Sequence, residues 1–221
     1  MTMHHTVQNL IDIKKSIINI LEDKNISKIP KIIAVSKTFS SDKILPLIDY
    51  GHIDYGENKV QEAIDKWTDI KSKKSNIKLH MIGKLQTNKV KFAVKLFDYI
   101  HSVDSEKLAQ KIFDEQTKIN RKIKIFIQVN IGEEDQKSGI NKNELSKLII
   151  FCKKINLEVV GLMCIPPANS DPEKYFIEMN LLNNEFKFKE LSMGMSSDFI
   201  KASENNASFL RIGSSIFGQR Y

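Results

Sequence analysis

The stretch Ile32–Thr38 reads IIAVSKT, an aliphatic run over its first four residues that is followed by a serine and a lysine. Continuous aliphatic strands are typical of a parallel sheet that is buried on both faces. A lysine at the end of such a strand either packs its stem while its ammonium reaches water, or loses its proton on burial. The neutral amine of Lys37 would be the form that condenses with an aldehyde. The run alone therefore predicts a parallel strand and leaves both interpretations of Lys37 open.

Strand-like and helix-like segments alternate along the rest of the chain. The first segment, Val7–Asp23, has mostly helical spacing of its apolar residues and predicts an amphipathic helix. The expected strands are Ile32–Ser36, Ile53–Gly56, Lys78–Ile82, Tyr99–Ser102, Ile123–Asn130, Glu158–Met163, Leu191–Met193 and Phe209–Ile212. The helices expected between them are Ser41–Asp49, Val60–Ile70, Lys89–Leu96, Ser105–Lys118, Lys142–Lys153, Pro172–Phe186 and Asp198–Ser203. This alternation implies parallel strands joined by right-handed crossovers.

Eight such units favour a single closed (β/α)8 TIM barrel over an open doubly wound sheet. No Gly-x-Gly-x-x-Gly motif follows the first strand, which also argues against the open sheet. Little chain remains after Phe209–Ile212, so we expect the N-terminal helix, within residues 1–25, to pack outside the barrel in the last gap. No linker rich in glycine, serine or proline divides the sequence. Residues 1–221 are therefore predicted to form a single domain.

Composition excludes several classes of protein. No apolar run reaches the roughly 20 residues that span a bilayer, and the N-terminus lacks the basic-then-apolar pattern of a signal peptide. Cys152 and Cys164 have no metal-type spacing, so a cytoplasmic protein with free thiols is expected. The net charge of +7 comes from scattered lysines without interleaved aromatic residues, which argues against a dedicated nucleic-acid reader. We expect neither a nucleic acid nor a membrane as partner.

Glycine and serine follow the last two expected strands. Barrels commonly bind a phosphate with these two loops, through backbone N–H groups at the start of a helix. Here one loop holds Gly194 with Ser196 and the other holds Gly213 with Ser214. Glycine allows close backbone approach, serine hydroxyls add donors, and Arg211 adds a positive charge. Glycine and serine are also ordinary loop residues, so the pattern favours a phosphate site without excluding plain loops.

Strand eight of a barrel lies next to strand one, so Lys37 and such a phosphate site would share one rim. A lysine facing a phosphate cup is the arrangement of a pyridoxal phosphate site. The carboxyl ends of the strands therefore predict a place where an aldehyde cofactor reacts with Lys37 while its phosphate is bound opposite.

Short motifs, in order along nearly the whole chain, carry a resemblance to a known family. They are Ala34–Thr38, Tyr55–Asn58 with Gln61 and Glu62, His80–Gly83 with Leu85–Lys89, Ile100–Asp104, Gln128–Asn130 with Lys137–Gly139, Gly161–Met163, Leu191–Ser196 and Arg211–Gly213. The chain resembles the pyridoxal phosphate homeostasis protein family. The resemblance implies a barrel similar to the N-terminal domain of alanine racemase, without the second domain of the racemase.

The resemblance also implies that pyridoxal 5'-phosphate is the cofactor and that Lys37 carries it as a Schiff base. Two positions depart from the family pattern: Ser214 stands where threonine is usual, and Phe39 stands where a basic residue is common. Lys137 matches a family lysine near the site, and it is equally well explained as a solvated loop lysine. The other residues that the resemblance places at the cofactor are Ser196, Gly213 and Ser214 at the phosphate, Asn58, His80 and Met163 at the ring, and Arg211 at either the phosphate or the ring nitrogen.

The resemblance implies a protein without established catalysis that holds and transfers vitamin B6 vitamers, with pyridoxal phosphate-dependent apo-enzymes as its expected partners. Chemistry on an amino acid needs a positioned base besides the lysine, and His80, His101 and Tyr55 are the candidates. The racemase dimer uses a second domain that this sequence lacks, so we expect a monomer.

Two alternatives remain open. A pyridoxal phosphate-dependent amino-acid racemase would abolish the optical activity of L-alanine. A Schiff-base aldolase, with Lys37 attacking a sugar phosphate, would be colourless. The cofactor hypothesis predicts a yellow protein that absorbs at roughly 420 nm.

Overall fold

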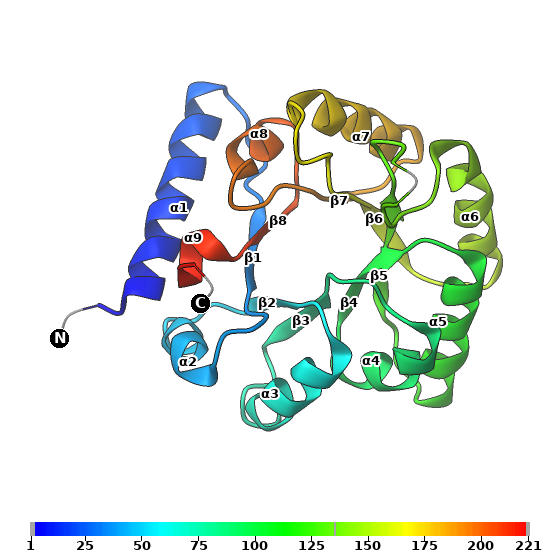
Figure 1. Cartoon of the computed structure of the whole chain (residues 1–221), viewed down its shortest axis with the longest axis horizontal. Helices are drawn as coiled ribbons and strands as arrows, with labels where there is room; N and C mark the ends of the chain where they lie inside the picture. Colours follow the sequence, from blue (N-terminus) through cyan, green and yellow to red (C-terminus); the bar gives the residue numbers. More distant parts are fainter. Residues whose placement is uncertain (1–2, 135, 220–221) are drawn as a thin grey trace.

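The computed structural model describes residues 3–134 and 136–219, and within them eight parallel strands form a closed barrel. Each strand pairs with its neighbours in chain order, and the last strand closes on the first through pairs that run from Lys31 and Phe209 to Ala34 and Ile212. Figure 1 shows the strands as an inner ring with the helices around it. The predicted (β/α)8 barrel is confirmed, and the open doubly wound sheet is excluded.

The observed strands agree with the expected ones to within one residue at either end. They are β1 (Lys31–Val35), β2 (Asp54–Glu57), β3 (Lys78–Met81), β4 (Tyr99–Val103), β5 (Lys124–Val129), β6 (Val159–Cys164), β7 (Glu190–Ser192) and β8 (Phe209–Ile212).

The helices also follow the expected order. A short last helix is added, which the spacing of apolar residues did not predict. They are α1 (His5–Asp23), α2 (Ser41–Asp49), α3 (Val60–Lys73), a 3-10 turn η1 (Thr87–Lys89) leading into α4 (Val90–Leu96), α5 (Glu106–Lys118), α6 (Lys142–Lys154), α7 (Glu173–Glu185), α8 (Phe199–Glu204) and α9 (Ser214–Phe217). None of the helices in the described ranges has the length and apolar character needed to cross a membrane.

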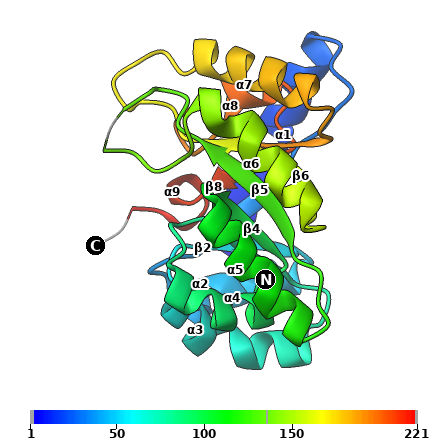
Figure 2. The same ribbon diagram turned by 90° about the vertical axis from the view of Figure 1, so that its right-hand side faces the viewer.

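Side chains alternate along each strand between the barrel interior and the layer beneath the helices. Ile33 belongs to a small buried cluster inside the barrel, which also includes Phe126 and Phe209. Its neighbours Ile32 and Ala34 belong to the larger cluster under the helices. Lys37 comes two residues after β1, at the end of the barrel where the strands finish. Figure 2 shows the loops that follow β5 and β6 on the same side of the barrel as the C-terminal segment.

The N-terminal helix covers the outside of the barrel where the last unit is short. α1 buries a stripe that includes Leu10, Ile17 and Leu21, and it contacts α2, α8 and α9. The side-chain amide of Asn9 donates a hydrogen bond of 2.9 Å to the carbonyl oxygen of Ile216 in α9. Because α9 has only four residues, α1 supplies the cover that a full eighth helix would provide.

Candidate functional site

The backbone around Lys37 is held by acidic side chains from β2 and α3. The hydroxyl of Ser36 donates to Oε1 of Glu57 at 2.8 Å, and the amide of Thr38 donates to Oε1 of Glu62 at 2.5 Å. Thr38 has a φ of +67°, a left-handed conformation that needs such support. Lys37 itself is half-buried. The two carboxylates therefore fix the chain on both sides of the lysine.

Glu57 is the centre of this support and is fully buried. Besides Ser36, its Oε1 accepts hydrogen bonds from Nζ of Lys66 at 3.0 Å and from Nε1 of Trp67 at 2.9 Å. The Lys66 ammonium also donates to the carbonyl oxygen of Ser36 at 2.8 Å. Glu57 and Glu62 stand in the motifs quoted above, but their supporting role was not predicted, because it depends on contacts between separate elements.

The loops after β7 and β8 are joined by one serine. The Ser196 hydroxyl oxygen accepts hydrogen bonds from the backbone amides of Gly213 at 3.3 Å and Ser215 at 3.4 Å. The amide of Arg211 donates to the carbonyl oxygen of Gly194 at 2.9 Å, which ties the two loops together a second time. Backbone amides that converge on an oxygen atom are the donors that a phosphate accepts. The structure thus brings together Gly194, Ser196 and Gly213 as the sequence predicted, with Ser214 exposed beside them.

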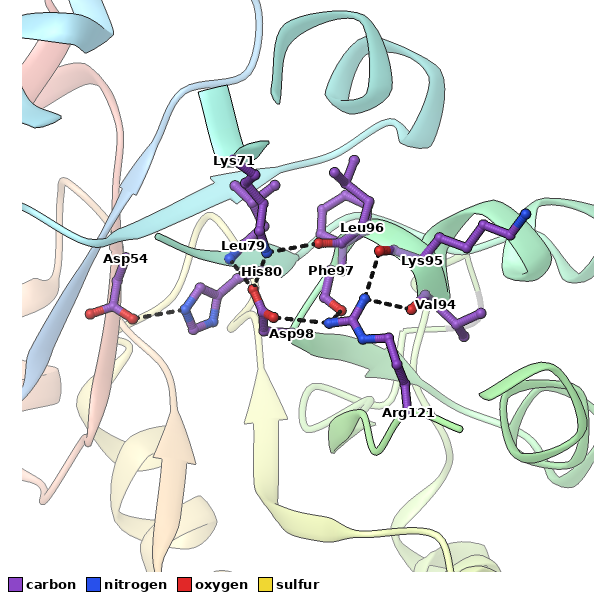
Figure 3. A network of polar contacts seen from close by, with 10 residues as sticks. All are labelled: Asp54, Lys71, Leu79, His80, Val94, Lys95, Leu96, Phe97, Asp98 and Arg121. Atoms are coloured by element: carbon purple, nitrogen blue, oxygen red, sulfur yellow. Dashed lines mark hydrogen bonds and ion pairs between the residues drawn. The ribbon is translucent and has the colours of Figure 1, made fainter. Parts of the chain in front are cut away.

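A chain of hydrogen bonds crosses the barrel interior from Asp54 to Arg211. Oδ1 of Asp54 lies 3.1 Å from Nε2 of His80, and Nδ1 of His80 lies 2.9 Å from Nε2 of His101. Figure 3 shows the first of these contacts. Nδ1 of His101 lies 2.9 Å from Oγ of Ser192, which accepts a hydrogen bond of 2.7 Å from Nη1 of Arg211. We call these five residues the interior chain.

The hydrogen positions in the interior chain follow from its two ends. A carboxylate only accepts and a guanidinium only donates, so His80 donates from Nε2 to Asp54 and accepts on Nδ1 from His101. Burial lowers the pKa of both histidines, which keeps them neutral, as this scheme requires. Burial alone would raise the pKa of Asp54, but the hydrogen bond with His80 and the electrostatic interactions with His80, His52 and Lys78 together outweigh it, and the pKa is lowered. Every donor in the chain therefore points from Arg211 towards Asp54.

Acid is expected to weaken the fold through these buried histidines. Burial lowers the pKa of His52 from 6.5 to about 4, and it lowers the pKa values of His80 and His101 as well. Below pH 6.5 the unfolded chain takes up protons that the folded chain refuses, so stability present at pH 7 to 8 is lost as the pH falls. Each histidine makes the free energy of unfolding change by up to about 1.4 kcal/mol per pH unit in this range.

Urea unfolding between pH 8 and pH 5 measures this slope. A His52→Gln variant should have a shallower slope than the wild type, and the same change at the exposed His5 serves as the comparison. A free energy of unfolding that does not depend on pH over this range would contradict the neutral state of the three histidines.

The other residues predicted at the site lie at the same end of the barrel or inside it. Asn58 follows β2 and is half-buried, and its Oδ1 has no hydrogen-bond partner within the described ranges. A Cβ on Gly83 would lie 2.4 Å from the backbone oxygen of Asn58, so only glycine fits there. Met163 is buried in the interior cluster, and Lys137 is exposed in the loop after β5.

Arg211 is buried, with 4% of its surface exposed. Besides the bond to Ser192, its Nη2 donates to the carbonyl oxygen of Cys164 at 2.8 Å. The guanidinium is therefore held inside the barrel by β6 and β7.

Metal and thiol chemistry find no support in the part of the chain that the structure describes. No group of three or more histidine, cysteine, aspartate or glutamate side chains in these residues is arranged to hold a metal ion. Burial raises the pKa of the thiols of Cys152 and Cys164 to about 12, so both stay protonated and unreactive near neutral pH.

Comparison with known proteins places this chain in a family. Residues 11–221 match the family model described as "Alanine racemase, N-terminal domain". A pyridoxal phosphate homeostasis protein of Aquifex aeolicus is 37% identical over 200 residues, which cover 86% of this chain and 87% of that protein. The solved structure of PipY of Synechococcus elongatus with pyridoxal phosphate bound is 31% identical, with a TM-score of 0.80 over 91% of this chain and all of that chain.

An alanine racemase of Clostridium difficile has a TM-score of 0.71 at 16% identity and covers 98% of this chain but 56% of the racemase chain, which shows a shared fold only. The match over nearly the whole length to the homeostasis proteins is closer in sequence. This chain therefore belongs to the pyridoxal phosphate homeostasis protein family, whose barrel is that of the alanine racemase N-terminal domain.

Proposed function

We propose that this chain binds pyridoxal phosphate covalently through Lys37 and acts in the cytoplasm to hold and transfer the cofactor, without catalysing a reaction of its own. The observation that carries the proposal is the joining of the loops after β7 and β8 on Ser196, at the end of the barrel where β1 delivers Lys37. The relatives named above, one of them solved with pyridoxal phosphate, support the same cofactor.

The residues present suit each part of this cofactor. The hydroxyl of Ser196 is a donor suited to a phosphate, and the amides of Gly213 and Ser215, which donate to its oxygen, lie beside it. The unpartnered oxygen of Asn58 is a polar group at the same rim for the ring. Arg211 uses two of its five N–H donors on Ser192 and Cys164, which leaves the others for the phosphate or the ring nitrogen.

When bound, the cofactor supplies an aldehyde that an amine can attack and a ring that withdraws electrons. Lys37 would hold the cofactor through its Nζ, the amine at this rim that can react with an aldehyde. Glu57 and Glu62 hold the backbone on either side of the lysine and so limit where its amine can reach.

A carrier is favoured over a racemase because the side chains expected to act as acid or base are occupied elsewhere. Both ring nitrogens of His80 and of His101 are engaged within the interior chain. Tyr55 lies beneath the helices, where it contacts the rings of His52 and Trp67, and burial raises the pKa of its hydroxyl. None of these three groups is placed to exchange a proton with a substrate at the rim.

Borohydride trapping tests the proposal. The purified protein is loaded with pyridoxal phosphate, reduced, digested and analysed by mass spectrometry, and we expect the cofactor mass on the peptide that contains Lys37. The loaded protein should then activate a pyridoxal phosphate-dependent apo-enzyme and leave the optical activity of L-alanine unchanged. Cofactor on another lysine would overturn the assignment of Lys37. Loss of the optical activity would establish the racemase alternative.

A further inference from the structure

A cavity of about 530 Å³ lies at the amino-terminal end of the barrel, opposite to Lys37. It is bounded by α1 and by the segments that lead into β1 and β2, and Figure 1 shows α1 alongside β1. This volume falls in the range of small-molecule sites. Its apolar walls are formed by Ile17, Ile18, Ile29, Pro30, Ile32 and Ile53.

Asp54 brings a buried carboxylate to this cavity. Its exposed fraction is 7%, and Oδ1 is used by His80. The second carboxylate oxygen forms no hydrogen bond with the residues that the structure describes, and Figure 3 shows it directed away from His80. This oxygen is not among the buried side-chain atoms that lack a partner, so it is open to the cavity, and a ligand ammonium that donates to it forms a charge-assisted hydrogen bond. The nearby His52 is not that donor, because its Nε2 bonds the carbonyl oxygen of Asp54 at 2.9 Å.

Two lysines line the same cavity. Lys14 and Lys31 are exposed, and within the described ranges neither forms an ion pair. Nζ of Lys14 lies 5.7 Å from the ring centre of Tyr50, and Nζ of Lys31 lies 5.1 Å from that of Phe209. Their long stems leave both ammonium groups able to reach an anion in the cavity. The site thus combines one carboxylate oxygen that no described side chain uses, two cations and apolar walls.

We propose that this cavity is a second ligand site, for a small zwitterion with an apolar body, namely a free amino acid with a hydrocarbon side chain. Its ammonium pairs with the second oxygen of Asp54, its carboxylate pairs with Lys14 and Lys31, and its side chain lies against the isoleucines. A simple anion would be repelled by Asp54, and a simple hydrocarbon would leave that carboxylate without a partner. The site does not depend on the cofactor, so this proposal and the proposed function can be tested independently of each other.

Three matched probes test the proposal by isothermal titration calorimetry on the full chain without added cofactor. They are L-leucine, 4-methylpentanoate, which lacks the ammonium, and isopentylamine, which lacks the carboxylate. We expect leucine to bind and each truncated probe to bind at least about tenfold more weakly, because a hydrogen bond to a charged group contributes about 1.5 to 3 kcal/mol. In ¹⁵N spectra, leucine should also shift the side-chain signals of His80, which shares Asp54 with the ligand. Equal binding of the three probes, or no binding of leucine, overturns the proposal.

Variants locate the ligand. Asp54→Asn should weaken leucine binding, and Ile29→Trp, at an exposed residue of the cavity wall, should block the cavity without touching the interior chain. Lys78→Met is the matched control, since Lys78 pairs in register with Asp54 and does not line the cavity. Lys37→Ala should bind leucine as the wild type does. Leucine binding that is lost in Lys37→Ala and retained in Ile29→Trp would place the ligand at the opposite rim and overturn the proposal.

Discussion

A Lys37→Ala variant is expected to lose the visible absorption band that the wild type shows after loading with pyridoxal phosphate. Alanine has no amine at the end of β1, so no carbon–nitrogen bond to the cofactor can form there. The donors of Ser196, Gly213 and Ser215 are untouched by this change. The variant should therefore still bind the cofactor, more weakly and without the band. An absorption spectrum of the loaded and dialysed protein makes the measurement.

The matched control is Lys84→Ala, at an exposed lysine in the loop after β3. This variant should keep the full band, because surface amines react with the aldehyde only transiently and lose it on dialysis. If Lys37→Ala retained the band after dialysis, another lysine would be the one that binds the cofactor. The absorption spectrum of a Lys137→Ala variant would then show whether it is the loop lysine Lys137.

Replacing Glu57 with alanine is expected to cost about 3 to 5 kcal/mol of unfolding free energy, the usual effect of breaking a buried charge pair. The change leaves the Lys66 ammonium, the Trp67 indole N–H and the Ser36 hydroxyl without their shared acceptor. The Lys66 side chain is only 9% exposed, so water cannot replace the carboxylate easily. Urea unfolding followed by circular dichroism measures the loss.

Glu106→Ala provides the comparison at the surface. Glu106 pairs with the exposed Lys147 at 3.7 Å, and such pairs contribute less than about 1 kcal/mol. A Glu57→Ala variant no less stable than Glu106→Ala would show that the buried carboxylate is not what holds the backbone beside Lys37. A Glu57→Gln variant keeps one acceptor and should fall between the two.

The barrel could be predicted from the sequence because its strands are buried on both faces. Runs such as Ile32–Val35 and Ile125–Ile127 have no polar interruption, and each is separated from the next strand by a segment with helical spacing. The four-residue α9 was missed because it is too short to show a period. The shared position of Lys37, Ser196 and Gly213 at one end of the barrel could be predicted because a barrel places the ends of all strands together, whereas their role at a cofactor stays a prediction.

The supporting contacts could not be predicted in the same way. His101 and Ser192 bond across 91 positions of sequence, and each residue taken alone is ordinary in a buried strand. Glu57 and Trp67 meet because β2 and α3 pack at one particular distance, which no local pattern encodes. The amino-terminal cavity could not be predicted for the same reason, since its walls come from three separate segments.

The interior chain also bears on how this barrel reaches its final form. Asp54 lies on the second strand and Arg211 on the last, so its bonds are complete only after β8 has closed on β1. Aliphatic strands tolerate a slip of two residues, which keeps every side chain on its own face. A slipped closure would bury a carboxylate and a guanidinium without partners, at a cost of several kcal/mol. The interior chain therefore stabilises the correct register of the strands over slipped arrangements that hydrophobic packing alone would allow.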